Sequence, residues 1–258
     1  MNLNQLTTPQ EWDNYWDQMK LPAEVRKGKD LYINEILKIF DRFLPKNENL
    51  SILEVGGAPG RYLAYMARNF QYKICVLDYS EVGCKKTNEN LKLLNLPGMV
   101  FKKDLFSDLS DLPKFDIVYS LGFIEHFSDL ETTIKKHLEL LKVGGILVIG
   151  TPNFLGINGL FINRLAPQEK ATYNSVSMDI KNWKNFEKDF NLKPVFKGYI
   201  GGFEPGIYHC KNITILNMSI LFFLNITKLI IFDRFKFLRN FNSKYWSGYV
   251  IGIYQKIE

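Results

Sequence analysis

Short apolar runs alternate with amphipathic stretches along the chain from residue 50 onward. Five apolar runs predict strands at 51–55, 73–77, 99–102, 115–120 and 146–150, and three amphipathic stretches predict helices at 61–70, 81–94 and 130–141. Strand, helix and strand repeated at this spacing predict a parallel sheet with helices on both faces. The strands are apolar almost throughout, as strands covered on both faces should be.

Further elements flank this repeating pattern. Helices are predicted at 11–19, 30–43 and 179–190, and two more strands at 194–200 and 249–254. Lys142-Val143-Gly144-Gly145 predicts the end of a helix and a turn before the fifth strand. An insertion of about 45 residues separates the last two strands.

The composition is that of an ordinary globular protein, with 258 residues of which 46% are hydrophobic and 23% charged. Lys and Arg number 33 against 27 Asp and Glu, a formal net charge of +6. Residues 203–258 hold seven of these cations and only three of the anions, so most of the excess lies at one end of the chain. A nucleic-acid-binding surface needs denser clusters of Lys and Arg, and we therefore expect no nucleic-acid partner.

The spacing of cysteine and histidine predicts no metal site. Cys75, Cys84 and Cys210 are too scattered for a Cys-x-x-Cys pair, which indicates free thiols in a reducing cytosol. Residues 1–18 lack the basic and apolar regions of a signal peptide. We therefore expect a cytoplasmic protein.

A glycine-rich turn, Glu54-Val55-Gly56-Gly57-Ala58-Pro59-Gly60-Arg61, joins the first predicted strand to the next helix. Such a turn lets a ligand approach the backbone and the free N–H groups of the helix. A dinucleotide fingerprint starting at Gly56 would need glycine at positions 58 and 61, and a phosphate-binding loop would need Gly-Lys-Ser/Thr. Neither is present, which leaves an acid followed by Gly-x-small-x-Gly.

This remaining pattern resembles motif I of the class I S-adenosylmethionine (SAM)-dependent methyltransferases. The resemblance continues through Asp78, Asp104, Ile124-Glu125-His126-Phe127 and Thr151-Pro152-Asn153, in the family's order and spacing. It implies an α/β, Rossmann-like fold with a seven-stranded, mostly parallel sheet of order 3-2-1-4-5-7-6, whose last strand is antiparallel. Among the family, the chain is similar to the small-molecule O-methyltransferases that act on quinones and sugars.

The resemblance also implies a set of cofactor-binding residues for SAM. Asp78 would accept the ribose hydroxyls, Asp104 would contact the adenine, and Glu54 would pair with the methionine amine. Either Arg26 or Arg61 would meet the cofactor carboxylate. The full implied set is Glu54, Gly56, Gly57, Ala58, Gly60, Asp78, Tyr79, Asp104, Leu105 and Leu121.

The resemblance implies a catalytic role for His126, since histidine titrates in the range that suits a general base for a substrate hydroxyl. In the alternative, the Glu125-His126 pair only shapes the loop. Small-RNA 3′-end methyltransferases use a Glu-x-x-Glu-His metal site, but Gly122 stands at the first Glu position and His209 lies far downstream. We therefore expect no metal.

Two segments outside this pattern allow more than one interpretation. Trp12, Tyr15 and Trp16 lie at helical spacing and either close over the cofactor or pack against the core. Residues 213–232 hold 14 apolar residues in 20, but a polar stripe argues against a lipid-facing span; its members are Thr214, Asn217, Asn225 and Lys228. The segment 213–241 is then either a helical cap over an apolar substrate pocket or a homodimer contact, or it lies on a membrane surface. In the membrane interpretation Phe235, Phe237, Leu238 and Phe241 dip in beside Arg234, Lys236, Arg239 and Lys244.

These observations define the expected organisation and function. The chain divides into an N-terminal helical cap (1–45), a SAM-binding domain (46–202), the apolar and basic insertion (203–247) and the last strand (248–258). The expected activity is methyl transfer from SAM to a hydroxyl of a lipophilic, quinone-like or sugar- or lipid-linked acceptor, in the cytoplasm or at the inner membrane face. The alternative is a catalytically silent SAM-binding protein with a regulatory or assembly role. Nucleic-acid methylation is disfavoured, because Ser120-Leu121-Gly122-Phe123 replaces the Asn/Asp-Pro-Pro-aromatic motif.

Overall fold

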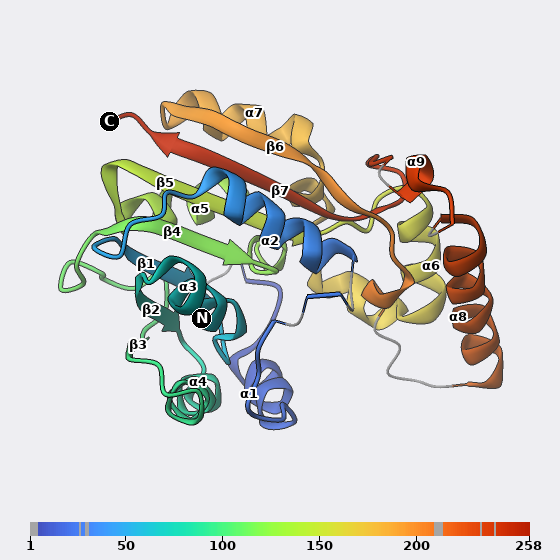
Figure 1. Ribbon diagram of the computed structural model, residues 1–258, viewed down its shortest axis with the longest axis horizontal. Coiled ribbons are helices and arrows are strands. Elements are labelled where there is room, and N and C mark those ends of the chain that lie inside the picture. Colours follow the sequence, from blue (N-terminus) through green and yellow to red (C-terminus); the bar gives the residue numbers. More distant parts are fainter. Residues whose placement is uncertain (1–4, 26, 29–30, 209–213, 233, 240) are drawn as a thin grey trace.

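The computed structural model is built around a seven-stranded sheet of order β3-β2-β1-β4-β5-β7-β6, as predicted (Figure 1). It describes residues 5–25, 27–28, 31–208, 214–232, 234–239 and 241–258. The expectations for Arg26, His209 and Cys210 lie outside these residues. Strands β1 to β5 are parallel neighbours, and β7 is antiparallel to both β5 and β6.

The strands are β1 (Ser51–Val55), β2 (Lys73–Asp78), β3 (Gly98–Lys102), β4 (Phe115–Leu121), β5 (Leu141–Pro152), β6 (Leu192–Phe203) and β7 (Ser247–Lys256). The longer helices are α1 (Pro9–Asp17), α2 (Leu31–Phe43), α3 (Arg61–Phe70), α4 (Glu81–Leu93), α5 (Leu130–Glu139), α6 (Ile157–Leu165), α7 (Ile180–Asp189) and α8 (Ile215–Thr227). Shorter helical turns are η1 (Ile124–His126), η2 (Pro167–Thr172), η3 (Ser175–Met178), η4 (Pro205–Ile207), η5 (Lys228–Phe232) and α9 (Lys236–Arg239).

Two apolar cores lie on opposite faces of the sheet. Helices α2 and α3 bury residues such as Phe40 and Leu63 against one face, and α5 and α7 bury Ile134 and Trp183 against the other. Figure 1 shows α2 crossing the near face with α5 behind the strands. Strands buried on both faces account for the continuous apolar runs in the sequence.

One local expectation was wrong, and one helix was not predicted. Lys142–Gly145 was expected as a turn, but β5 begins at Leu141 and runs through these residues, with a shift in register against β4 near Phe115. Gly144 has φ +75°, which glycine adopts without strain, so the strand bends here and does not stop. Helix α6 was not predicted, because residues 157–165 are apolar on several sides and have no helical stripe.

The insertion between β6 and β7 forms α8, a turn of π-helix at η5, and α9. A small third core joins it to the body, where Leu224 of α8 packs with Ile162 and Leu165 of α6 and with Phe203. The helical stretch Ile215–Phe232 has 18 residues with a mean hydropathy of 2.0, which by length and composition alone is sufficient to cross a membrane. The predicted domain boundaries 1–45, 46–202, 203–247 and 248–258 stay a prediction.

Candidate functional site

The glycine-rich turn forms a tight loop between β1 and α3 at the carboxyl edge of the sheet. Gly56 and Gly60 have φ values of +65° and +80°, which favour glycine. Gly60 is the residue before α3 and no side chain caps the helix, so its first N–H groups are left for a ligand. A Cβ at Gly56 would lie 2.3 Å from Cδ2 of Phe123, and a Cβ at Gly57 would lie 2.2 Å from Cγ of Glu54. Side chains larger than hydrogen are excluded at both positions.

Glu54, the second-last residue of β1, is a buried carboxyl group beneath this loop, with 4% of its surface exposed. Its Oε2 atom has no hydrogen-bond partner among the described residues, and neither does the buried hydroxyl of Tyr119. Burial raises the pKa of Glu54 to about 8, and the nearby Tyr119 hydroxyl and Arg61 guanidinium offset only part of this effect. A buried acid without a partner is costly, so this atom is a ready acceptor for a cationic ligand group.

Asp78 ends β2 on the other side of the loop and is also buried. Its carboxylate accepts a hydrogen bond from the backbone N–H of Ser80 at 2.9 Å and a longer one from that of Ala58 at 3.4 Å. Burial raises the pKa of Asp78 to about 6, although these N–H groups favour the charged form. The carboxylate therefore ties the glycine loop to the start of α4 and stays ionised at neutral pH.

A narrow cavity opens beside Asp78 and contains several of the predicted residues. Its lining is Gln5, Val55, Gly56, Leu77, Asp78, Tyr79, Lys103, Asp104, Leu105, Phe123 and Phe127. Asp104 is exposed and its side chain accepts the N–H of Phe106 at 2.9 Å, which is the geometry of a turn residue. Leu121 does not line this cavity, since its side chain lies against Gly150 at the end of β4.

His126 lies in η1, directly after β4, and is largely buried. Its Nδ1 atom lies 2.9 Å from the carbonyl oxygen of Thr172, which only a protonated Nδ1 can satisfy by donating a hydrogen bond. Burial lowers the pKa of His126 to about 4, so the ring is neutral at physiological pH and Nε2 carries the lone pair. The rings of Trp12 and Tyr173 flank it with centroids at 5.0 and 5.3 Å.

Glu125 is a further buried acid, which the sequence analysis named beside His126 but did not include among the site residues. Its Oε1 atom lies 3.9 Å from Nε2 of His126, and its Oε2 atom has no hydrogen-bond partner in the described part of the chain. Burial raises the pKa of Glu125 to about 8. A Cβ added at Gly122 would meet only Oε1 of Glu125, at 3.6 Å, so the glycine leaves room above this carboxyl group. The position of Glu125 directly before His126 was the only feature of the sequence that pointed to this acid.

The N-terminal segment covers the cavity. The amide of Gln5 donates to the hydroxyl of Tyr79 at 2.9 Å, and the backbone N–H of Leu6 donates to the carbonyl of His126 at 2.8 Å. In α1, Trp16 is buried and would contact a Cβ at Gly83, while Tyr15 is 46% exposed. The aromatic residues of α1 therefore both pack against α4 and reach the ring of His126.

Arg61 is the one described member of the pair expected to meet the cofactor carboxylate. It is the first residue of α3, and its guanidinium carbon lies 5.2 Å from the ring centroid of Tyr62. Although burial lowers the pKa of Arg61, the nearby Tyr62, Tyr32 and Tyr15 raise it overall. The side chain is thus a stable cation beside the loop.

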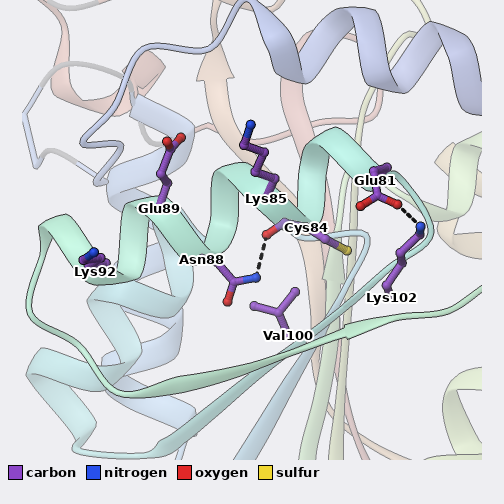
Figure 2. Close-up of a pocket in the computed structure, with 8 residues that line it drawn as sticks. All are labelled: Glu81, Cys84, Lys85, Asn88, Glu89, Lys92, Val100 and Lys102. Carbon is purple, nitrogen blue, oxygen red and sulfur yellow. Dashed lines mark hydrogen bonds and ion pairs between the residues drawn. The ribbon is translucent and has the colours of Figure 1, made fainter.

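Another pocket lies outside this site, between α4 and the edge strand β3 (Figure 2). It is lined by Glu81, Cys84, Lys85, Asn88, Glu89, Lys92, Val100 and Lys102. Lys102 pairs with Glu81, and Lys85 and Glu89 point away from Val100 in Figure 2. None of the predicted site residues lines it. Within the described ranges, no three His, Cys, Asp or Glu side chains lie close enough to hold a metal ion.

Comparisons with known proteins agree with this arrangement. The model of a methyltransferase-domain family matches residues 28–191. The chain is 25% identical over 204 residues to the mitochondrial ubiquinone biosynthesis O-methyltransferase of Dictyostelium discoideum, a match that covers 72% of this chain and 62% of that protein. The chain spans about three fifths of the length of this curated relative.

Solved structures share the fold at low sequence identity. The geranyl diphosphate C-methyltransferase of Streptomyces coelicolor A3(2) has a TM-score of 0.63 at 11% identity, covering 97% of this chain and 98% of that one. The [4+2]-cyclase SpnF has a TM-score of 0.62 at 14% identity, covering 98% and 96%. These likenesses extend over the whole sheet and its helices.

A mostly parallel, seven-stranded sheet with a glycine loop flanked by two buried acids defines the class I SAM-dependent methyltransferase fold. The chain belongs to the methyltransferase-domain family, and the predicted family and sheet order are confirmed. The family's cofactor, SAM, fits the residues that are present, because the unpartnered Oε2 of Glu54 suits an ammonium group and the uncapped start of α3 leaves backbone N–H groups for a ligand.

Proposed function

We propose that this chain transfers the methyl group of SAM to a hydroxyl of a small, lipophilic acceptor of quinone-like or sugar- or lipid-linked type. The observation that carries the proposal is the pair of buried carboxyl groups, Glu54 and Asp78, on either side of the glycine loop. The acceptor class rests on the resemblance to ubiquinone biosynthesis O-methyltransferases. The rings of Trp12 and Tyr173 beside His126 suit an apolar or aromatic acceptor.

The cofactor-binding roles are assigned by chemistry. Glu54 pairs with the amino group of the methionine end, Arg61 with its carboxylate, and Asp78 with the ribose hydroxyls. Tyr79, Asp104 and Leu105 line the cavity on the adenine side, and Gly56, Gly57, Ala58 and Gly60 supply backbone that a ligand can approach. Leu121 is the last residue of β4, and its side chain lies beside Gly150 of β5.

Bound SAM supplies a methyl group already activated by its positive sulfonium, so the protein mainly aligns and deprotonates the acceptor. His126 accepts the hydroxyl proton at Nε2 while Thr172 holds Nδ1–H in place. The imidazolium that forms lies beside Glu125, with Oε1 of Glu125 3.9 Å from Nε2 of His126. Because burial raises the pKa of Glu125 to about 8, its carboxyl group is mostly protonated at neutral pH and supplies little negative charge there. The proton then leaves to solvent.

The test is turnover of SAM labelled in its methyl group, with catechols, polyprenylated phenols and glycolipids as acceptors. We expect S-adenosylhomocysteine and a labelled acceptor, and a His126→Asn variant that still binds SAM but turns over roughly 10²- to 10⁴-fold more slowly. The [4+2]-cyclase SpnF has a similar fold, so the fold alone does not require methyl transfer. The alternative is therefore a protein that binds SAM without transferring its methyl group. Tight SAM binding without turnover on any acceptor class would support that alternative, and no SAM binding would refute the proposal.

A further inference from the structure

The outward face of α8 and η5 is mainly apolar, with the exposed Ser219 as a polar position within it. Ile215, Phe222, Phe223, Leu229 and Ile230 are between 58% and 86% exposed. At about 100° per residue, these five positions span about 120° of the helix circumference. Only Asn217 and Leu224 of α8 are buried. An exposed apolar face of this size on a helix is typical of an interaction surface.

The inward face of the same helix combines apolar and polar contacts. Leu224 is buried in the third core, the ammonium of Lys228 lies 2.6 Å from a carboxylate oxygen of Glu204, and the side-chain oxygen of Asn217 accepts a hydrogen bond from Arg164 at 3.2 Å. A helix that only covers a soluble core keeps its large apolar residues inward. Here the buried leucine and the two polar contacts fix the helix to the body, and most of its large apolar side chains stay exposed on the other side.

Charge decides which partner suits this face. Residues 214–246 contain five Lys or Arg and one Asp. Lys228 pairs with Glu204, and Lys244 lies 3.8 Å from Asp179, so the charge argument rests on Arg234, Lys236 and Arg239. Arg234 is exposed directly after η5, next to Phe235 and close in sequence to Phe237, which are 50% and 71% exposed. Cations beside exposed aromatic and aliphatic side chains are the signature of a segment that lies on an anionic bilayer surface. A two-fold contact between copies would instead bring the same cations toward each other.

We propose that this face, defined by Ile215, Phe222, Phe223, Leu229, Ile230 and Phe237 and called the α8–α9 surface, docks on a lipid bilayer with anionic headgroups. The helix lies in the plane of the interface. A spanning orientation would pull Lys228 and Asn217 from Glu204 and Arg164 in the body of the protein.

Docking there has a consequence for the acceptor, which rests on the proposed function. The insertion leaves the sheet at Phe203 and returns at Ser247. Strand β7 is antiparallel to β5, so its first residues lie beside the carboxyl end of β5. Because β5 is parallel to β4, the insertion starts and ends at the same edge of the sheet as the carboxyl end of β4, and His126 follows that end. In Figure 1 the arrow of β4 points toward the end of the molecule where α6, α8 and α9 lie. A lipid-linked acceptor would thus approach from the membrane to the side of the site that holds His126.

The test is flotation of the full chain with vesicles of phosphatidylcholine alone or mixed with phosphatidylglycerol. We expect binding to the anionic vesicles, weakened by salt. Phe222→Ser/Phe223→Ser should lower the binding at least about tenfold, because two apolar side chains lose their burial. Arg234→Ala should lower it about fivefold. The matched control is Leu93→Ser/Met99→Ser, which removes two exposed apolar residues near the opposite edge of the sheet and should bind as the wild type does.

Absence of vesicle binding by the wild type would overturn the proposal, and so would equal binding by Phe222→Ser/Phe223→Ser. A dimer in light scattering that this variant dissociates would also overturn it, since a second copy would then cover the surface. Calorimetric titration with SAM accompanies each variant. Vesicle binding without SAM binding would refute the proposed function and leave the docking proposal intact. SAM binding without vesicle binding would refute the docking proposal and leave the proposed function intact.

Discussion

The ammonium of Lys228 lies 2.6 Å from a carboxylate oxygen of Glu204, and both side chains are largely buried. Glu204 also accepts hydrogen bonds from the backbone N–H groups of Leu31 and Gly206, so one carboxylate joins the start of α2, the end of β6 and the insertion. Together with the burial of Leu224 in the third core, this contact fixes which face of α8 meets the protein.

Removing one partner of this pair should destabilise the fold. Lys228→Met leaves a buried, uncompensated carboxylate at Glu204, and we expect a loss of about 3–5 kcal/mol in the free energy of unfolding. Glu204→Gln combined with Lys228→Met should recover most of the loss, because neither residue then carries a buried charge. Urea denaturation of the two variants and the wild type measures both effects. Equal stability of Lys228→Met and wild type would contradict the prediction.

SAM binding should release a proton from Glu54. With a pKa of about 8, this carboxyl group is mostly protonated at pH 7 before the ligand binds, and it must ionise to pair with an ammonium group. We expect the release of close to one proton per SAM at pH 7, measured by calorimetry in buffers of different ionisation enthalpy. Glu54→Gln should abolish the release and weaken binding. A variant that releases as many protons as the wild type would rule out Glu54 as the source.

The affinity for SAM should fall in two stages as the pH is lowered. Between pH 8 and about 6, protonation of Glu54 opposes binding, so the affinity drops about tenfold per unit. Below about pH 6, Asp78 is also protonated and cannot accept hydrogen bonds from both ribose hydroxyls. The affinity for SAM then falls by about a further tenfold per pH unit. Asp78→Asn should bind more weakly but lack the second stage. Titrations across this range test the prediction, and an unchanged steepening in Asp78→Asn would contradict it.

Gly57→Ala should damage the site more than its small size suggests. The new methyl group would lie 2.2 Å from Cγ of Glu54, so the buried carboxyl group must move. We expect a loss of about 1–3 kcal/mol in stability and at least a tenfold loss of SAM affinity.

The matched control for Gly57→Ala is Gly144→Ala in β5. This glycine has φ +75° but nothing within 4 Å of a new Cβ, so the variant should lose only about 1–2 kcal/mol from backbone strain and bind SAM normally. Thermal unfolding and SAM titration of both variants separate the two effects. Equal SAM affinity in the two alanine variants would show that the loop tolerates a side chain.

Much of the fold and the donor half of the site follow from the sequence. Strand-turn-helix units such as β1 with Gly56–Gly60 and α3 are built by neighbouring residues, so the apolar runs predict the strands and the parallel connections restrict their order. Asp78 and Glu54 are predictable for the same reason, since each is the last or nearly the last residue of a strand whose end lies at the ligand edge. Strand β5 was predicted five residues too late at its start, where Gly144 bends the chain without ending the strand, and two residues too short at its end.

The tertiary structure decided what depends on contacts between distant segments. The sequence does not reveal that Phe123 lies over Gly56, that Gln5 reaches Tyr79 or that Glu125 is left with an unpartnered oxygen, because each involves side chains from separate elements. The basic and apolar insertion is the clearest case. Helix α8 is apolar on most sides, so its periodicity cannot show which face is buried. The burial of Leu224 and the contacts of Lys228 with Glu204 and of Asn217 with Arg164 decide which face meets the protein.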